Sequence, residues 1–308
     1  MEHFLYKWLH TVYMLEVQPT TFARALQVVR THLLPSFGYR EVHSITTYDI
    51  QNFLSKKTQD KLSPATVKII RNTLSKAFQT ALDWELIKKN PIERVKLPKI
   101  EKNEKHIWTV EEAKQFLDHC EVLRWKVAFS LALHTGLRRG ELMALKWQNI
   151  DLENRTIKIK ESLAYTKEQG LFFTTPKTAN SVRELVISSS LIGYLKLVRD
   201  EHKKMKERMG PAYHENDLVI CTAEGKPVQP RNLARTFDRL IEKAKVKKIS
   251  LHGLRHTNAT LLMKQGINPK IVSERLGHSN VSITLDIYSH TDLAMQEESV
   301  SRLEELLI

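Results

Sequence analysis

The last sixty residues of the sequence concentrate side chains that handle phosphate and protons. His252, Arg255 and His256 follow one another at spacings of three and four, which places them on one side of a helix. His278 comes next, and Tyr288 ends the apolar run "LDIY". A single tyrosine in such a helix is more often a half-buried packing residue than a reactive one. The function of these residues therefore has to be judged from their neighbours.

Metal binding is a weak explanation for the histidines and cysteines. His252 and His256 are four apart, but the catalytic zinc pattern has glutamate directly after the first histidine, where this chain has Gly253. Cys120 and Cys221 are the two cysteines, far apart and without CxxC spacing. A disulfide framework or structural zinc site is thus unsupported, and we expect both thiols to be buried as small apolar groups.

Two earlier stretches carry further cations. In "HTGLRRGELMALKW", Gly136 marks a turn, Arg138 and Arg139 follow it, and a helix resumes at Glu141. An arginine at a helix start can bind an anion together with free backbone N–H groups, although pairing with surface carboxylates is the alternative. In "TTPKTANSVRELVI", Lys177 lies in a turn between two expected strands. A lysine there is normally exposed and inert, unless other residues give it a substrate.

Taken together, these residues could cleave a phosphodiester without a metal. Two arginines can bind the non-bridging oxygens of a phosphate bidentately and neutralise the charge of the transition state. No carboxylate cluster suited to metal ions accompanies them in the sequence. A tyrosine with a pKa near 10 is a poor nucleophile at neutral pH, but nearby arginines and a histidine base would favour its phenolate. We therefore expect Tyr288 to be the nucleophile.

Composition agrees with a polyanionic partner. The chain has 308 residues, with 48 Lys and Arg against 35 Asp and Glu, a net charge of +13. That balance suits nucleic acid or an acidic membrane surface. No apolar run approaches the roughly 20 residues that span a bilayer, and Lys7 and His10 interrupt the N-terminal segment, unlike a signal peptide. We expect a cytoplasmic protein that has no membrane partner.

Periodicity predicts two domains. Residues 1–97 read as four helices, the last with Ser63 as cap and Pro64 at its first position. The stretch "VKLPKIEKNEKHIWT" loses all periodicity, so we place a linker at residues 98–107. Residues 108–308 are mixed: "TIKIKESL", "LFFTT" and "RELVIS" predict three strands, and helices lie on both sides of them, the last over residues 292–308.

The motifs "HTGLRRGEL", "PKT", "HGLRHTNATLL" and "LGHSNVSITLDIYSH", in this order, resemble those of the tyrosine recombinases. The resemblance is to integrases of phages and Gram-positive conjugative transposons, and it runs from about Trp108 to His290. Residues 1–97 resemble the helical core-binding domain of that family. The resemblance implies a mainly α fold, in which a SAM-like four-helix domain precedes an α+β catalytic domain with a small antiparallel sheet.

The resemblance also implies a role for each residue. Glu141 and His256 would support the site, and the choice of Arg138 over Arg139 rests on the family's "TGLRxxE" register. The catalytic roles that it implies are Arg138 and Arg255 as phosphate clamps, Lys177 as the acid that protonates the departing 5′-oxygen, His252 as proton-transfer partner, His278 as transition-state donor and Tyr288 as nucleophile.

The implied reaction is a transesterification on DNA. Tyr288 attacks a phosphate to form a 3′-phosphotyrosine, and the freed 5′-hydroxyl of a partner strand later reverses the step. Because the linkage retains the bond energy, neither ATP nor a metal is needed, and we expect no cofactor. Four protomers would act on two double-stranded attachment or core sites, with accessory DNA-bending or excision factors as further partners. The expected outcome is integration and excision of a mobile element.

Two other functions could use a similar set of residues or helices. A type IB topoisomerase shares the tyrosine chemistry but relaxes DNA as a monomer without a defined sequence. A DNA-binding regulator could use the same helices without cleavage, but it would not need all the catalytic residues. Integrases of this group usually carry a further N-terminal arm-binding domain, whereas this chain starts almost directly on the core-binding helices.

The C-terminal segment "HTDLAMQEESVSRLEELLI" predicts one more helix, with Val300, Leu303, Leu306 and Leu307 along one side. Such a short helix needs a surface that buries this apolar side. It could dock on its own domain or in a pocket of a neighbouring protomer.

Overall fold

The computed structural model describes residues 1–308 except 100–105, 176–181, 289–299, 302, 306 and 308, and at 286–288 it describes the backbone alone. The chain forms two compact units, and each is considered by itself. One unit is Met1–Asn103 with Tyr165–Gly170, and the other is Glu104–Ala164 with Leu171–Ile308. The linker that we predict at residues 98–107 overlaps the undescribed part, so its bounds stay a prediction.

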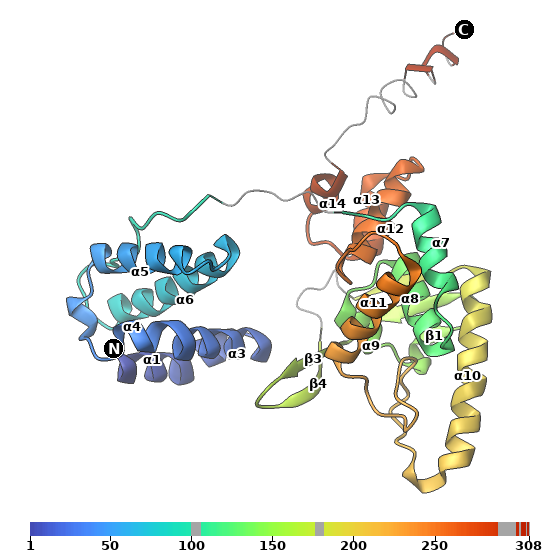
Figure 1. The fold of residues 1–308 in the computed structure, drawn as a ribbon, viewed down its shortest axis with the longest axis horizontal. Helices are drawn as coiled ribbons and strands as arrows, with labels where there is room; N and C mark the ends of the chain where they lie inside the picture. The colour runs from blue at the N-terminus through green and yellow to red at the C-terminus, as the bar shows by residue number, and fades with distance from the viewer. Residues whose placement is uncertain (100–105, 176–181, 289–299, 302, 306, 308) are drawn as a thin grey trace. The chain divides into compact units, whose positions relative to one another are not determined.

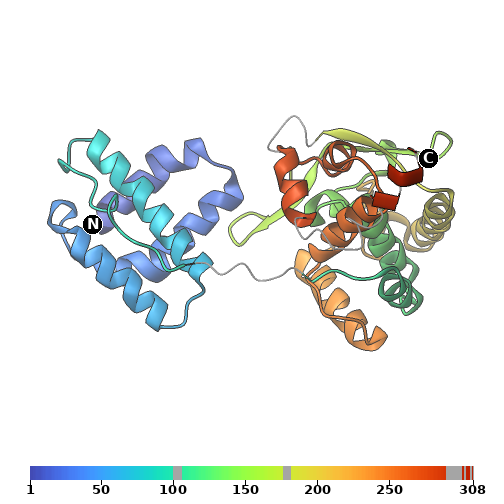
Figure 2. The same cartoon turned by 90° about the horizontal axis from the view of Figure 1, so that it is seen from above.

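The part of the chain before residue 98 contains helices and no strand, as predicted (Figures 1 and 2). Its first two helices each contain a π-helical turn between two α-helical segments, which the periodicity did not predict. The elements are α1 Glu2–Trp8, η1 Leu9–Tyr13, α2 Met14–Glu16, α3 Pro19–Val28, η2 Val29–Leu33, α4 Leu34–Phe37, η3 Val42–Ser44, α5 Thr47–Gln59 and α6 Pro64–Asp83.

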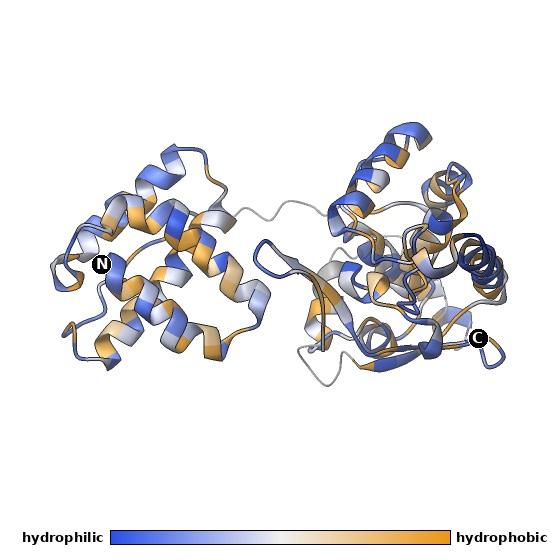
Figure 3. Cartoon of the chain, turned by 90° about the horizontal axis from the view of Figure 1, so that it is seen from below, coloured by the Kyte–Doolittle hydropathy of each residue, from blue (hydrophilic) through white to orange (hydrophobic). Residues whose placement is uncertain are grey.

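Caps and an apolar core explain why these helices begin and pack where they do. Ser63 accepts a hydrogen bond from the backbone of Thr66 and Pro64 is the first residue of α6, as the sequence predicts. Trp8, Ile70 and Phe78 are fully buried in the core. Figure 3 shows hydrophobic and hydrophilic residues on each of these helices, as expected of amphipathic helices around one core.

The second unit combines helices with two small sheets (Figure 1). Its N-terminal part contains α7 Val110–Asp118, α8 Leu123–Thr135, α9 Arg139–Met143 and η4 Trp147–Asn149. The strands are β1 Ile150–Asp151, β2 Thr156–Ile159, β3 Ser162–Thr166, β4 Gly170–Thr174 and β5 Arg183–Val186. The remaining helices are α10 Ser189–Met209, η6 Gly210–Ala212, α11 Pro230–Ala244, α12 Gly253–Lys264, α13 Pro269–Leu276 and α14 Val281–Tyr288.

The strands form two sheets rather than one. β1, β2 and β5 make an antiparallel sheet in which Ile159 pairs with Arg183, and β3 pairs with β4 in a separate two-stranded sheet. The prediction of a single strand over "TIKIKESL" was therefore wrong. The chain leaves the first sheet after Ile159 and enters the second at Ser162. Lys160 and Glu161 connect the two strands.

Trp108 attaches the start of this unit to α11 through an aromatic cluster and to α12 through a hydrogen bond. The buried rings of Trp108, Phe116 and Phe237 lie with centroids 4.8–5.7 Å apart. The Trp108 indole Nε1–H donates to the carbonyl of Lys247 at 2.6 Å, and its backbone N–H donates to the Thr257 hydroxyl at 3.1 Å. Because residues 253–260 are all buried, α12 is a central helix of the unit.

Two further predictions can be compared with the structure. Cys120 and Cys221 are both buried and unbonded to each other, which confirms their assignment as small core residues. Among the described helices, none combines the length and the apolar character needed to cross a membrane.

Candidate active site

Two glycines that end helices form the framework of the site. Gly136 caps α8 with φ 64°, and Gly277 caps α13 with φ 67°. Glycine suits both positions because residues with a side chain rarely adopt positive φ. A Cβ on Gly136 would lie 2.3 Å from the side chain of Leu276, so the end of α8 and the end of α13 approach closely. Each glycine leaves a carbonyl oxygen available at its helix end.

Arg255 binds the first of these carbonyls. It lies on α12 with only 2% of its surface exposed, and its Nη1 donates to the oxygen of Gly136 at 2.8 Å. Its Nη2 is buried and finds no hydrogen-bond acceptor among the residues described. Burial and the charge of Arg138 lower the pKa of Arg255 to about 9, so the guanidinium stays protonated at neutral pH. A buried cation with an unused donor is suited to an anionic ligand.

Arg138 binds the second carbonyl. It is the N-cap residue of α9, and its Nη2 donates to the oxygen of Gly277 at 2.8 Å. Its Nη1 donates to the Glu141 carboxylate at 2.7 Å, while 38% of its side chain remains exposed. Arg139, its neighbour, is exposed. The structure thus favours Arg138 over Arg139 as the arginine of the site, a choice that the residue types alone left open.

Glu141 joins Arg138 to another arginine, Arg183. Its Oε2 accepts from the backbone N–H of Arg138 and from Nη2 of Arg183, both at 3.0 Å. The carboxylate is 4% exposed and Arg183 is 7% exposed. Burial acts to raise the pKa of Glu141, but the hydrogen bond and charge of Arg183, followed by hydrogen bonds from Arg138, more than offset it and lower that pKa. Glu141 is therefore a buried carboxylate held ionised by two arginines.

The histidines gather beside the arginines. His252 is the exposed N-cap residue of α12, His256 is buried one turn later, and their rings meet edge to face with centroids 4.7 Å apart. The Nδ1 of His278 is 2.8 Å from the Thr284 hydroxyl. Burial, then the charges of Arg255 and Arg138, and more weakly those of His256 and His252, lower the pKa of His278 to about 4. His278 is thus neutral near pH 7.

Two of the predicted residues, Lys177 and Tyr288, lie wholly or partly outside the described part of the chain. Lys177 lies outside the described residues. Tyr288 is the last residue of α14, one helical turn after Thr284, and its side chain is likewise outside the described part. α14 packs against α12 and α13, which carry or immediately precede Arg255 and His278. The structure therefore brings together Arg138, Glu141, His252, Arg255, His256 and His278.

Sequence reasoning missed Arg183 and Thr284. Arg183 alternates with Glu184 on β5 and so faces the same side as the buried Leu185, a pattern that could have identified an inward-facing arginine. Thr284 is fully buried in a helix and carries no comparable signal.

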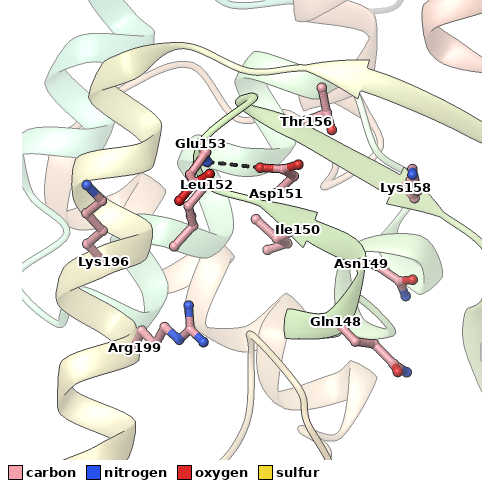
Figure 4. Close-up of a pocket in the computed structure, with 10 residues that line it drawn as sticks. All are labelled: Gln148, Asn149, Ile150, Asp151, Leu152, Glu153, Thr156, Lys158, Lys196 and Arg199. Carbon is pink, nitrogen blue, oxygen red and sulfur yellow. Dashed lines mark hydrogen bonds between the residues drawn. The ribbon is translucent and has the colours of Figure 1, made fainter.

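A surface pocket of about 630 Å³ lies elsewhere in the unit, beside β1, β2 and α10 (Figure 4). Lys158, Lys196 and Arg199 give it a basic lining. Its Asp151 carboxylate accepts the backbone N–H groups of Glu153 and Asn154 at 3.0 and 2.8 Å, which is a turn-stabilising arrangement. It contains none of the predicted catalytic residues. Within the described part of the chain, no three His, Cys, Asp or Glu side chains cluster as metal ligands.

Comparison with known protein families identifies both units. Residues 107–295 match the phage integrase family, and residues 1–58 match the phage integrase N-terminal SAM-like domain. A XerC-like tyrosine recombinase of Caldanaerobacter subterraneus subsp. tengcongensis is 33% identical over 99% of this chain and 82% of its own. The ICEBs1 integrase of Bacillus subtilis is 29% identical over 95% of this chain and 80% of its own.

Solved structures share the fold. The Tn1549 transposon integrase in complex with transposon right end DNA has a TM-score of 0.82 at 22% identity, over 98% of both chains. A lambda integrase tetramer bound to a Holliday junction has a TM-score of 0.69 at 20% identity, over 92% of this chain and 76% of that one. The chain belongs to the phage integrase family. It is a tyrosine recombinase, an enzyme that transfers DNA strands in site-specific recombination.

Proposed function

We propose that this recombinase cuts and rejoins DNA at defined double-stranded sites through Tyr288, so that a mobile element is integrated and excised. The observation that supports it most is the arginine pair. Arg138 and Arg255 are each anchored on the carbonyl of a helix-ending glycine, and the second has a buried Nη2 without a partner in the described residues. Two fixed guanidinium groups suit the non-bridging oxygens of one phosphodiester.

The arginines act as the phosphate gains charge. Attack by the Tyr288 oxygen on phosphorus forms the P–O bond of a 3′-phosphotyrosine while the bond to the 5′-oxygen breaks. The transition state carries more negative charge than the phosphodiester, and fixed cations stabilise it without reorganising. Since the new linkage keeps the bond energy, the freed 5′-hydroxyl of a partner strand reverses the step without ATP.

Protons move through the other side chains. The tyrosine hydroxyl gives up its proton to His252, with His256 beside it. Lys177 protonates the departing 5′-oxygen. His278 is neutral and its Nδ1 is held by Thr284; if the hydroxyl donates to Nδ1, the Nε2–H remains to donate to a phosphate oxygen. These roles are the ones that the resemblance to tyrosine recombinases implies.

Assembly on DNA is the second part of the proposal. Four protomers bind two DNA segments in the cytoplasm, with accessory DNA-bending or excision factors. Val300, Leu303 and Leu307 are 58%, 56% and 77% exposed, so the apolar side of the C-terminal segment is available for another surface. We propose that it docks on the neighbouring protomer, because apolar burial there would couple each nucleophile to assembly.

Covalent trapping tests the proposed function. A pool of nicked duplexes with randomised sequence is incubated with the full chain, and DNA linked to protein is recovered under denaturing conditions and sequenced. We expect enrichment of a defined sequence, and Tyr288→Phe should bind the enriched duplex with unchanged affinity but form no adduct. A persistent adduct in that variant would refute the assignment of the nucleophile. Adducts without sequence enrichment, together with relaxation of supercoiled plasmid by the chain alone, would favour a topoisomerase.

A further inference from the structure

Arg183 occupies a joint between β5, α9 and α13. Its Nη2 donates to Glu141 Oε2 at 3.0 Å, and its Nε donates to the carbonyl of Arg275 at 2.8 Å. Arg275 is the penultimate residue of α13, two positions before Gly277, whose carbonyl binds Arg138. One buried arginine therefore contacts both the carboxylate that holds Arg138 and the helix end that precedes His278.

Over the residues that the structure describes, the ion pairs of this cluster leave an excess of positive charge. Arg138, Arg183 and Arg255 carry three positive charges, and Glu141 carries one negative charge. Two positive charges are left for a ligand as long as Arg183 is present. Without Arg183, Glu141 would be compensated by Arg138 alone, and the charge left for the ligand would be halved. Glu141 would also become a buried carboxylate with a single partner, which is costly.

We infer that Arg183 is a positioning residue for strand cleavage: it neutralises Glu141 and fixes the end of α13, so that Arg138 and Arg255 both keep their charge for the scissile phosphate. This inference rests on the proposed function. Arg183 itself need not touch DNA, because it acts through Glu141 and Arg138. The pKa of Glu141 is consistent with this role. Burial acts to raise that pKa, and the hydrogen bond and charge of Arg183 lower it more than the hydrogen bonds from Arg138 do.

A first experiment needs no DNA. Thermal unfolding of the full chain is compared for Arg183→Met, Glu141→Gln and the double variant. Arg183→Met should lower the Tm by about 5–10 °C, because it leaves a buried charge poorly paired. Glu141→Gln should lower the Tm of the wild type but raise that of Arg183→Met. If Glu141→Gln lowers the Tm equally in both backgrounds, the charge-balance inference is wrong, whatever the protein does to DNA.

A second experiment measures cleavage of a nicked duplex that the wild type cleaves. The scissile group is either a phosphodiester or a methylphosphonate, in which a methyl group replaces one charged oxygen. Arg183→Met should cleave the phosphodiester roughly a hundredfold more slowly than the wild type. On the uncharged methylphosphonate its deficit should shrink to about tenfold or less, since less charge must be neutralised. Arg183→Lys, which keeps the charge, should retain most of the rate.

Arg275→Met is the matched control. Arg275 donates to the carbonyls of His134 and Val186 at the same joint, whereas the ion pairs of Glu141 are with Arg138 and Arg183. Any deficit that it causes should be the same on both substrates. Arg183 has only a structural role if Arg183→Met loses the same factor of cleavage rate on the phosphodiester and on the methylphosphonate. The same conclusion follows if Arg183→Met cleaves both substrates at the wild-type rate. If the wild type cleaves none of the duplexes tested, the proposed function is contradicted instead, and the unfolding experiment still decides the charge balance.

Discussion

Arg255 and Gly136 are 119 residues apart in the sequence, yet Nη1 of the arginine donates to the glycine carbonyl at 2.8 Å in the buried centre of the catalytic unit. The bond uses one edge of the guanidinium and leaves Nη2 for a ligand. In the proposed function the two nitrogens have separate roles: Nη1 anchors the guanidinium, and Nη2 would bind an oxygen of the phosphate. A lysine at this position could supply the charge but could not make both contacts.

The first prediction follows from that geometry. Arg255→Lys should slow covalent cleavage by about 100–1,000-fold, because a fixed donor to the transition state is lost. Binding of the same duplex should change by only a few fold, since many other phosphates are contacted. Cleavage is measured under single-turnover conditions and binding by gel shift. Arg139→Lys, the same change at an exposed arginine, should cleave normally; an equal loss there would show that the effect is not specific to the position of Arg255.

The second prediction concerns pH. Folding lowers the pKa of His278 from an ordinary 6.5 to about 4, so the unfolded chain binds the proton more readily. The resulting stability is complete above pH 6.5 and is lost as the pH falls from 6.5 toward 4. His278→Gln should flatten this part of the curve of unfolding free energy against pH, measured by urea denaturation. Curves of the two proteins that run parallel from pH 7 to 4 would contradict it.

The third prediction separates Lys177 from the arginines. If Lys177 protonates the 5′-oxygen, then a 5′-bridging phosphorothioate, whose sulfur leaves without protonation, should restore cleavage by Lys177→Ala. Arg138→Ala should not recover on that substrate, because its task is to neutralise charge. Single-turnover rates on the oxygen and sulfur substrates give the comparison. Equal recovery of both variants would show that the division of roles is wrong.

The fourth prediction concerns the C-terminal segment. Deletion of residues 292–308 should leave binding of a single DNA site near normal while reducing synapsis and recombination, because the apolar side chains would no longer join two protomers. Size-exclusion chromatography of the complexes with DNA measures assembly. A truncated chain that loses thermal stability as a DNA-free monomer would instead show that the segment docks on its own unit.

Local patterns predicted much of the fold. Asn268 caps α13 and Pro269 begins it, so the helix from Pro269 to Leu276 was predictable to the residue. α10 runs from Ser189 to Met209, and the residues on either side of it, Ser188 and Gly210, are residue types that commonly flank a helix. The π-helical turns after Trp8 and Val28 were not predicted, because the prediction assumed a regular α-helical period, from which an inserted residue departs.

The site was predictable in residue type but not in arrangement. Spacing indicated that His252 and His256 are adjacent, and their rings do meet. It could not indicate that His252 is exposed while Arg255 is buried, because the burial of Arg255 depends on Gly136 in a distant helix. Arg183 was overlooked for the same reason, because its role depends on its hydrogen bond to Glu141, which is 42 residues away in the sequence.

Each of the two arginines is anchored on one backbone carbonyl: that of Gly136 accepts from Arg255, and that of Gly277 accepts from Arg138. Most amino-acid changes leave a carbonyl oxygen where it is, whereas a side-chain acceptor disappears with a single substitution. The orientation of both guanidinium groups therefore depends on the backbone at the two positive-φ glycines and at the helix ends that they define. A substitution at either glycine should disturb the arginine that is anchored on it, even though the substitution removes no acceptor atom.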